Sequence, residues 1–258
     1  MKIFVLVKEV PDTYGDRKLN LATGLADRGA SDAVLDEITE RALEVALVAA
    51  EANPGSEVVA LSMAPETATA SVRRALAIGA GSAVHIADEA LRGADLGVTA
   101  SVLAAALRRG EPDLVITGNL STDGSGGVIG AMLAEHLGFA QLTSLSAVQA
   151  GADSVSGTRM TDFGPQEVSA SYPAVISVTE ALPDARFPNF KGIMAAKKKP
   201  LEVLTLADLG VDIDPAAAPQ AIMTAVAEKP ARAAGVKITD EGDAGTQLVE
   251  FLVKNRLV

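Results

Sequence analysis

Residues 114–137 read LVIT, GNLSTDGSGG and VIGAMLAEHL in succession, and this stretch decides the fold. An apolar run rich in β-branched residues, a turn rich in Gly, Ser, Thr and Asp, and an apolar run at helical spacing predict a strand, a loop and a helix. The backbone N–H groups of such a turn and of the following helix can bind an anion. We therefore expect a nucleotide phosphate above Gly124 to Gly130. The spacing matches neither GxGxxG nor GxxxxGK[ST], and many α/β proteins bind nothing at such a turn.

The same alternation of strands and helices runs through the first half of the chain. Strands are predicted at residues 1–7, 57–62, 83–87 and 114–117, and helices from 32 or 36 to 51 and at 67–78, 95–109 and 128–137. This order predicts right-handed crossovers and a parallel sheet covered by helices on both faces. Further strand-like runs at 143–148, 154–160, 166–171 and 174–179, separated by turns, predict an antiparallel extension of that sheet.

The fold class expected is therefore α/β, with a doubly wound, mostly parallel sheet, an antiparallel extension and a C-terminal arm. Residues 1–212 form the nucleotide-binding domain and 213–258 the arm. The arm ends in an amphipathic run at 245–253, whose residues Leu248, Phe251 and Leu252 need burial, so we expect it to pack on a partner.

Composition limits the kinds of function. A net charge of −11 argues against nucleic acid as the main partner, because phosphate binding needs a positive surface. Aromatic residues make up 3% of the chain, so a flat-ring cofactor would be held largely by something other than this chain. The absence of cysteine excludes disulfides and thiolate chemistry. Neither a signal peptide nor a long apolar run is present, so we expect a cytoplasmic protein that does not enter the membrane.

No set of nucleophile, base and orienting group can be assembled from this sequence. His85 and His136 are interpreted as structural or surface residues. Asp212 and Asp214 are interpreted as turn formers, and no metal site is expected. These observations favour a binding or carrier protein over an enzyme.

A second candidate region surrounds the basic run at Lys197 to Lys199. The run can bind an anionic partner, or it can be a solvated helix end that complements the helix dipole. Phe187 and Phe190 precede it among prolines and glycine. They are interpreted either as anchors for a partner protein or as core residues.

Four segments together resemble the β subunit of electron-transfer flavoprotein. They are FVLVKEVPDT at 4–13, GTRMTDFGPQEVSASYPAVIS at 157–177, GIMAAKKKPLEVL at 192–204 and DLGVD at 208–212. Their order matches the family over residues 1–212. The combination is more specific than any single motif.

The resemblance implies a heterodimer with an α subunit that holds most of one FAD. That flavin accepts electrons from dehydrogenases such as acyl-CoA dehydrogenases and passes them to a membrane quinone oxidoreductase. The β subunit of this family holds a structural AMP. By position, the nucleotide contacts here are Leu6, Asp36, Glu37, Ile38, Thr39, Met63, Gly118, Asn119, Asp123, Gly124, Ser125, Gly126, Gly127, Val128 and Ile129.

Two further sets of residues carry over from the resemblance. Thr13 and Ile38 correspond to positions that face the flavin. The partner-docking loop spans 183–199, and its contacts are Phe190, Lys191, Ile193 and Met194, with Phe190 as anchor. At 127–129 the family usually has Asn-Gln-Thr, whereas this chain has Gly-Val-Ile, so backbone donors must bind the phosphate.

Two alternatives stay open at this point. One is the β subunit of a bifurcating, NADH-dependent flavoprotein that holds a second FAD in place of AMP. The other is a nucleotide-binding regulatory module of the universal-stress type, which shares a doubly wound sheet and predicts a homodimer.

Overall fold

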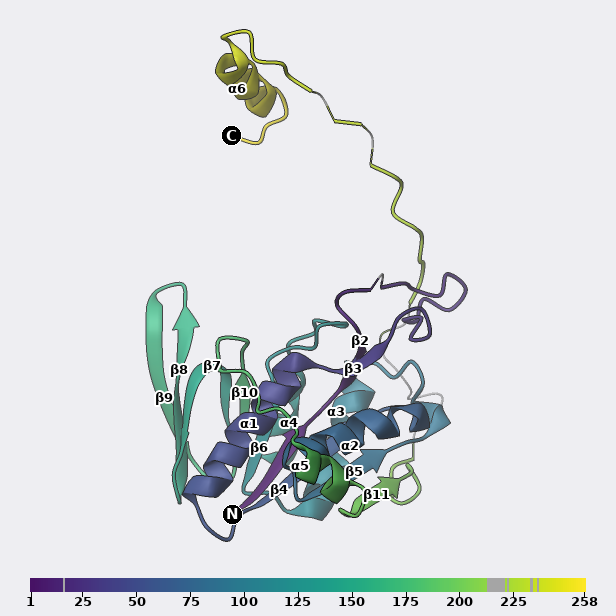
Figure 1. The fold of residues 1–258 in the computed structure, drawn as a ribbon, viewed down its shortest axis with the longest axis vertical. Helices are drawn as coiled ribbons and strands as arrows, with labels where there is room; N and C mark the ends of the chain where they lie inside the picture. The colour runs from purple at the N-terminus through teal and green to yellow at the C-terminus, as the bar shows by residue number, and fades with distance from the viewer. Residues whose placement is uncertain (16, 213–220, 222, 233, 236) are drawn as a thin grey trace. The chain divides into compact units, whose positions relative to one another are not determined.

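A nine-stranded sheet organises the larger part of the chain, in the order β11-β5-β4-β1-β6-β10-β7-β8-β9 (Figure 1). The computed structural model describes residues 1–15, 17–212, 221, 223–232, 234–235 and 237–258. The sheet strands are β1 Lys2–Leu6, β4 Glu57–Met63, β5 Ser82–Ile86, β6 Leu114–Gly118, β7 Ala140–Ala150, β8 Ser154–Thr161, β9 Gly164–Ser171, β10 Ala174–Val178 and β11 Leu201–Leu204. The helices are α1 Glu37–Ala52, α2 Thr69–Ile78, α3 Leu96–Gly110, α4 Ile129–Leu137, α5 Phe190–Ala196 and α6 Ala244–Lys254, with 3-10 turns η1 Glu66–Ala68 and η2 Glu89–Leu91.

Strand order reverses beside β1. The chain moves outward from β1 to β4 and β5, and then returns to place β6 on the other side of β1. All pairings from β11 to β7 are parallel. The carboxyl ends of β1 and β6 therefore flank a topological switch point, where α/β folds bind ligands.

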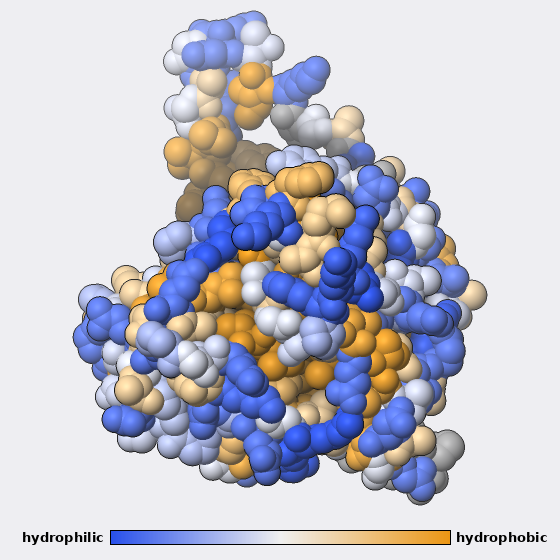
Figure 2. All heavy atoms as spheres, turned by 60° about the horizontal axis from the view of Figure 1, so that its bottom comes forward, coloured by the Kyte–Doolittle hydropathy of each residue, from blue (hydrophilic) through white to orange (hydrophobic). Residues whose placement is uncertain are grey.

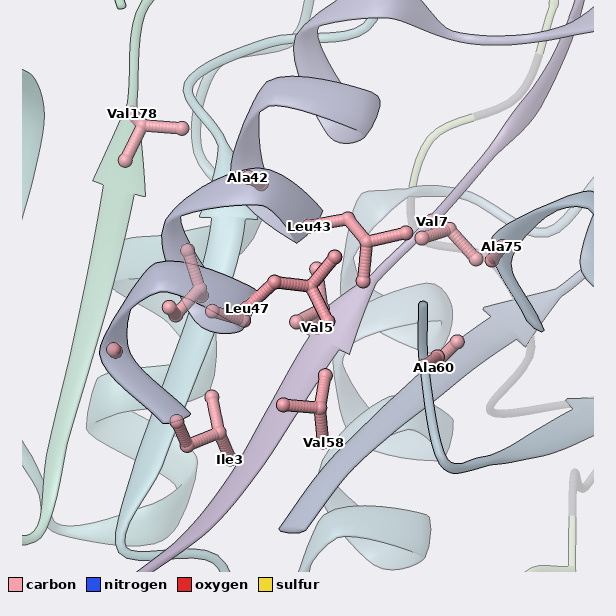
Figure 3. Packing of buried hydrophobic residues seen from close by; sticks show 14 of the residues in the cluster. Ile3, Val5, Val7, Ala42, Leu43, Leu47, Val58, Ala60, Ala75 and Val178 are labelled. Carbon is pink, nitrogen blue, oxygen red and sulfur yellow. The ribbon is translucent and has the colours of Figure 1, made fainter. Parts of the chain in front are cut away.

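Successive residues of β1 point into two different hydrophobic cores. Ile3 and Val5 pack with residues of α1 and α2, including Leu43 (Figure 3). Phe4 and Leu6 pack with residues of α3 and α4 on the other face. Because both faces of the central strands are buried, these strands are apolar throughout, as expected of a parallel sheet between two helix layers. The doubly wound prediction is confirmed.

The antiparallel extension consists of three strands, whereas the sequence analysis attributed four runs to it. β8 pairs antiparallel with β7 and with β9. β10 instead returns to the centre of the sheet, between β6 and β7 and parallel to both. All five residues of β10 are buried, which suits an interior strand. β7 belongs to both the parallel and the antiparallel part of the sheet. Near Ser144, whose φ is +57°, its register with β10 and with β8 shifts.

Short elements account for most other differences from prediction. β2 Glu9–Pro11 and β3 Ala33–Leu35 form a two-stranded sheet in a segment where no strand was predicted. β11 adds an edge strand in a region where no strand was predicted. The basic run at Lys197 to Lys199, interpreted as a possible helix end, directly follows α5, whose C-cap is Lys197.

The chain divides into two units, Met1–Thr224 and Ala225–Val258. The second unit contains α6, which buries none of its residues although Leu248, Val249, Phe251 and Val253 are apolar. The domain boundary expected at 212–213 stays a prediction, and residues 213–220 lie outside the described residues. Across the described residues, no helix is long and apolar enough to span a membrane. Figure 2 shows apolar side chains in patches between polar ones on the face turned forward.

Candidate functional site

A cleft opens at the switch point of the sheet. Leu6, Met63 and Gly118, the last residues of β1, β4 and β6, line its floor. The loop at 20–29 and the segment from η2 to α3 contribute to its walls. Its volume is about 1720 Å³, which exceeds the roughly 300–1,000 Å³ of ordinary ligand pockets. The turn after β6, where the sequence predicts the ligand site, lines this cleft, and the ligand itself stays a prediction.

The turn between β6 and α4 brings backbone close to the cleft. Gly127 has φ +67°, a conformation that glycine adopts without strain. A Cβ on Gly118 would lie 2.9 Å from Cγ2 of Ile38, so only glycine fits there without movement. α4 starts after Val128, whose side chain does not cap the helix. The N–H groups of the first turn of α4 are therefore suited to an anion.

Asp36 ties this turn to helix α1. Its side chain is 1% exposed, and Oδ1 accepts a hydrogen bond from the Ile38 amide at 3.1 Å, which caps α1. Oδ2 accepts from the Thr122 amide at 2.8 Å and from Thr122 Oγ1 at 3.2 Å. Asp36 therefore holds the turn against the start of α1 and does not itself line the cleft.

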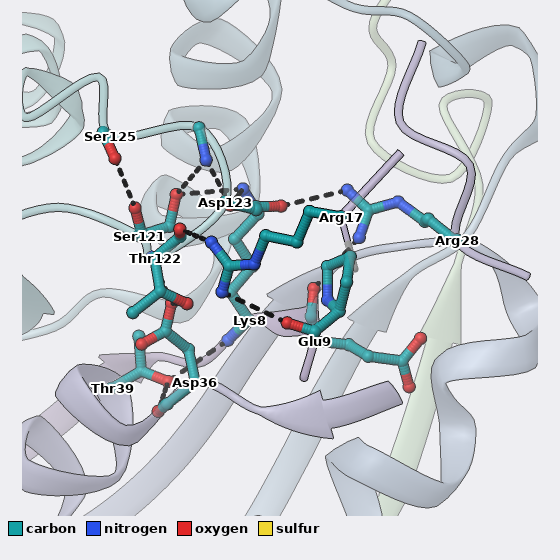
Figure 4. Close-up of polar contacts among 12 residues, drawn as sticks. Lys8, Glu9, Arg17, Arg28, Asp36, Thr39, Ser121, Thr122, Asp123 and Ser125 are labelled. Carbon is teal, nitrogen blue, oxygen red and sulfur yellow. Dashed lines mark hydrogen bonds and ion pairs between the residues drawn. The ribbon is translucent and has the colours of Figure 1, made fainter. Parts of the chain in front are cut away.

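Three basic residues reach the same turn from the N-terminal segment (Figure 4). Lys8 Nζ lies 2.7 Å from Asp123 Oδ1, and a terminal nitrogen of Arg28 lies 3.3 Å from Oδ2. Arg17 donates to the Thr122 carbonyl. Lys8 and Arg28 also line the cleft, and these two cations against the single carboxylate of Asp123 leave one net positive charge beside the turn. The sequence did not lead us to predict these three cations at the turn. The signal for Lys8 was its place directly after the first strand, at the edge where ligands bind.

Asp123 stays ionised because of these neighbours. Burial raises the pKa of its carboxyl, but the hydrogen bond and charge of Lys8, with hydrogen bonds from Ser121 and the Gly124 amide, outweigh burial and hold that pKa at about 2. The Asp123 side chain is 10% exposed. Its role is to hold the turn and the two cations together.

The structure brings most of the predicted nucleotide contacts to this region, in two groups. Residues that line the cleft are Leu6, Thr39, Met63, Gly118, Asn119, Gly124, Gly126, Gly127 and Ile129. Those outside the lining are Asp36, Glu37, Ile38, Asp123, Ser125 and Val128. Of the two flavin-facing candidates, Thr13 is exposed and Ile38 is buried against Gly118. Their role stays a prediction.

The second candidate region presents apolar side chains at the surface. Phe187 is 89% exposed and Phe190 is 80% exposed, so neither is a core residue of this chain. Ile193 and Met194 are also exposed, as is Lys191. Asn189 Oδ1 accepts from the Gly192 amide at 2.8 Å and caps α5. The predicted docking residues therefore all lie in the short helix α5, and Phe187 lies in the loop before it.

The remaining candidates have structural surroundings. His85 is fully buried in β5, and its Nε2 lies 3.0 Å from the Ala64 carbonyl oxygen. His136 is in the last turn of α4, where its carbonyl accepts from Arg108. No group of three or more His, Asp or Glu residues suited to a metal occurs among the described residues. Asp214 lies outside them.

The fold and the cleft define a class: doubly wound α/β proteins whose ligand site lies at the topological switch point of the sheet. Comparison with known proteins gives the family. The model of the electron transfer flavoprotein domain matches residues 23–209, and the chain belongs to that family.

Sequence similarity to individual proteins supports the same family assignment. The chain is 48% identical to electron transfer flavoprotein subunit beta of Mycobacterium tuberculosis over 264 residues, covering 99% of each chain. It is 47% identical to the subunit of the same name from Mycobacterium leprae, again covering 99% of each. It is 31% identical over 212 residues to the caffeyl-CoA reductase-Etf complex subunit CarD of Acetobacterium woodii, covering 82% of this chain and 80% of the relative.

Proposed function

We propose that this chain is the β subunit of a heterodimeric electron carrier and that its cleft holds AMP as a structural nucleotide. The observation that carries the proposal is the cleft at the switch point. There an uncapped helix start and a glycine turn lie beside Lys8 and Arg28. Phosphate is bound by such helix starts and by nearby cations.

The residues present fit a nucleotide phosphate despite the replacement at 127–129. Backbone N–H groups at the start of α4 would supply donors that the side chains of Val128 and Ile129 cannot. Lys8 and Arg28 would add charge. The apolar side chains of Leu6 and Met63 at the strand ends would contact the nucleoside.

The flavin belongs mainly to the partner in this proposal. FAD, held mostly by an α subunit, supplies the electron-accepting and electron-donating group of the complete carrier. This chain contributes binding surface, with Thr13 and Ile38 on the flavin side, and needs no acid or base of its own. We therefore assign it as a non-enzymatic, cytoplasmic carrier subunit. It serves dehydrogenases such as acyl-CoA dehydrogenases in fatty acid oxidation, and a membrane quinone oxidoreductase receives the electrons.

The two exposed apolar surfaces receive two partners. Phe190, Ile193 and Met194, with Lys191 beside them, dock the dehydrogenase, because a small apolar anchor suits a transient interface. The C-terminal arm, 213–258, packs on the α subunit through α6, whose apolar side chains are exposed in this chain.

A second candidate function is favoured by the size of the cleft. A volume of about 1720 Å³ leaves room for a ligand larger than a mononucleotide. The β subunit of a bifurcating, NADH-dependent flavoprotein would place a second FAD there. The similarity to CarD of the caffeyl-CoA reductase-Etf complex is compatible with that reading.

Release of bound nucleotide distinguishes the candidates. The chain is co-expressed with its α subunit, the purified complex is denatured, and the released nucleotides are quantified by chromatography. One AMP and one FAD per heterodimer support the carrier, whereas two FAD and no AMP support the bifurcating flavoprotein. A homodimer that forms without α and shows no flavin spectrum would instead indicate a regulatory module of the universal-stress type.

A further inference from the structure

The loop before α5 is bound to helix α1 by one arginine. The Arg186 guanidinium contacts Glu44 through Nε at 2.9 Å and through a terminal nitrogen at 2.8 Å. It also contacts Glu51 at 2.5 Å and 3.2 Å. The Arg186 amide donates to Glu44 Oε2 at 3.0 Å. Because Glu44 and Glu51 are two turns apart on α1, one planar guanidinium can bridge them.

Arg186 stabilises the ionised form of both glutamates. Burial raises the pKa of Glu44, but the hydrogen bonds and charge of Arg186 outweigh burial and lower that pKa. Hydrogen bonds from Arg186 also lower the pKa of Glu51. Both carboxyls are therefore ionised at neutral pH and remain acceptors for the arginine.

Other contacts fix the segment at further points. Arg41, on the same side of α1, donates to the Leu182 carbonyl and lies 2.5 Å from Asp184 Oδ1. At the other end, Lys199 Nζ donates to the carbonyls of Leu76 at 2.8 Å and Ala80 at 2.6 Å, at the end of α2. The segment that carries the exposed phenylalanines is thus tied to α1 and α2.

We propose that Arg186 is a positioning residue for dehydrogenase recognition and that it holds the next residue, Phe187, in the orientation that the partner binds. This inference rests on the proposed docking function. Phe187 is 89% exposed and has little packing of its own to fix it. A side chain that is ordered before binding loses less entropy on binding. Because Arg186 is bound to the two carboxylates of α1, it orders the neighbouring Phe187 before the partner binds and so lowers this entropy cost.

The test is a double-mutant cycle in the assembled heterodimer, with an acyl-CoA dehydrogenase that reduces the wild-type protein. Arg186→Gln should raise the KM for the flavoprotein about 3- to 10-fold and leave kcat unchanged, because only a fraction of molecules then presents Phe187 correctly. Phe187→Ala should raise KM at least as much. Adding Arg186→Gln to Phe187→Ala should change KM less than twofold.

Controls separate positioning from stability. Arg109→Gln removes an exposed ion pair with Glu202, 2.8 Å long, and should leave KM unchanged. The combined Glu44→Gln and Glu51→Gln variant should reproduce the KM of Arg186→Gln. It also tests the same contact from α1 if Arg186→Gln does not fold.

Three outcomes overturn the inference. An unchanged KM for Arg186→Gln, with a raised KM for Phe187→Ala, removes Arg186 as a positioning residue and leaves docking intact. Independent, multiplying effects in the double variant show that Arg186 acts without Phe187. An unchanged KM for Phe187→Ala removes the docking role on which the inference rests.

Discussion

Gly127→Glu tests the assignment of the cleft most directly. Gly127 lies in the turn before α4 with φ +67°, and a Cβ there would be 3.8 Å from the Asn119 carbonyl oxygen. The site therefore has space for a side chain. The substitution introduces backbone strain and a negative charge beside the place where we put the phosphate.

The two effects have different sizes. A non-glycine residue in the left-handed conformation costs about 1–2 kcal/mol. At a separation of about 6 Å, two like unit charges repel by about 3 kcal/mol at an effective dielectric constant near 20, so each charge of a phosphate bound at this turn would be opposed by an energy of that order. Charge repulsion should thus dominate, and the affinity for AMP should fall by about 100-fold or more.

Two control variants separate the effect of the added charge from the effect of backbone strain. Gly127→Ala has the same strain without the carboxylate. Gly138→Glu carries the same charge at φ +69°, in open space at the other end of α4. We expect AMP to be lost, and heterodimer assembly weakened, only in Gly127→Glu. AMP content is measured after denaturation, and affinity by calorimetry on nucleotide-free protein. Wild-type AMP content in Gly127→Glu would show that the nucleotide site lies elsewhere.

Three further changes test other parts of the structure. Phe190→Ala should slow reduction by the dehydrogenase about 5- to 30-fold in stopped-flow traces, with flavin content and melting unchanged, because this exposed side chain supports only the interface. An unaltered rate would remove it as an anchor. Asp123→Asn should lose about 1–2 kcal/mol in urea unfolding at pH 7, after allowance for screening by solvent. Since the folded pKa of Asp123, about 2, lies below the unfolded value of 3.8, its stabilisation is complete above pH 4 and disappears as pH falls towards 2. The two proteins should therefore converge in acid, and a constant gap would contradict this. Lys199→Met should lower the melting temperature by about 2–8 °C by leaving carbonyls at the end of α2 without their donor, whereas the exposed Lys198→Met should not. Equal melting temperatures would show that the contact contributes nothing.

Local patterns were sufficient to predict the alternation of strands and helices. Asp36 could be proposed as a helix start because its side chain caps the amides that follow it, a contact within two residues. The glycine turn after β6 could be located for the same reason, since turn chemistry is local. The position of a strand within the sheet, in contrast, is not determined by local sequence. The run at 174–178 is apolar whether it lies at the centre or in an extension, and its neighbour β6 is 60 residues earlier in the chain.

The contacts that shape the two sites are long-range, and a single sequence does not show them. Lys8 and Asp123 are 115 residues apart, and Arg186 and Glu44 are 142 apart. Neither pair has a spacing that distinguishes it from other surface charges. The strands β2 and β3 have three residues each, too few to show a period of two.

Helix α1 joins the two sites. Asp36 at its start holds Thr122 in the turn beside the cleft, and Glu51 near its end holds Arg186 in the proposed docking segment. At 1.5 Å per residue, the 15 residue steps from Asp36 to Glu51 span about 22 Å. Leu43 and Ala46 between these points are fully buried, so the helix cannot slide or bend without disturbing the core. Its length therefore fixes the distance from the cleft to the proposed docking surface. In the proposed carrier, a single packed helix thus holds the surface for the dehydrogenase at a fixed position relative to the structural nucleotide.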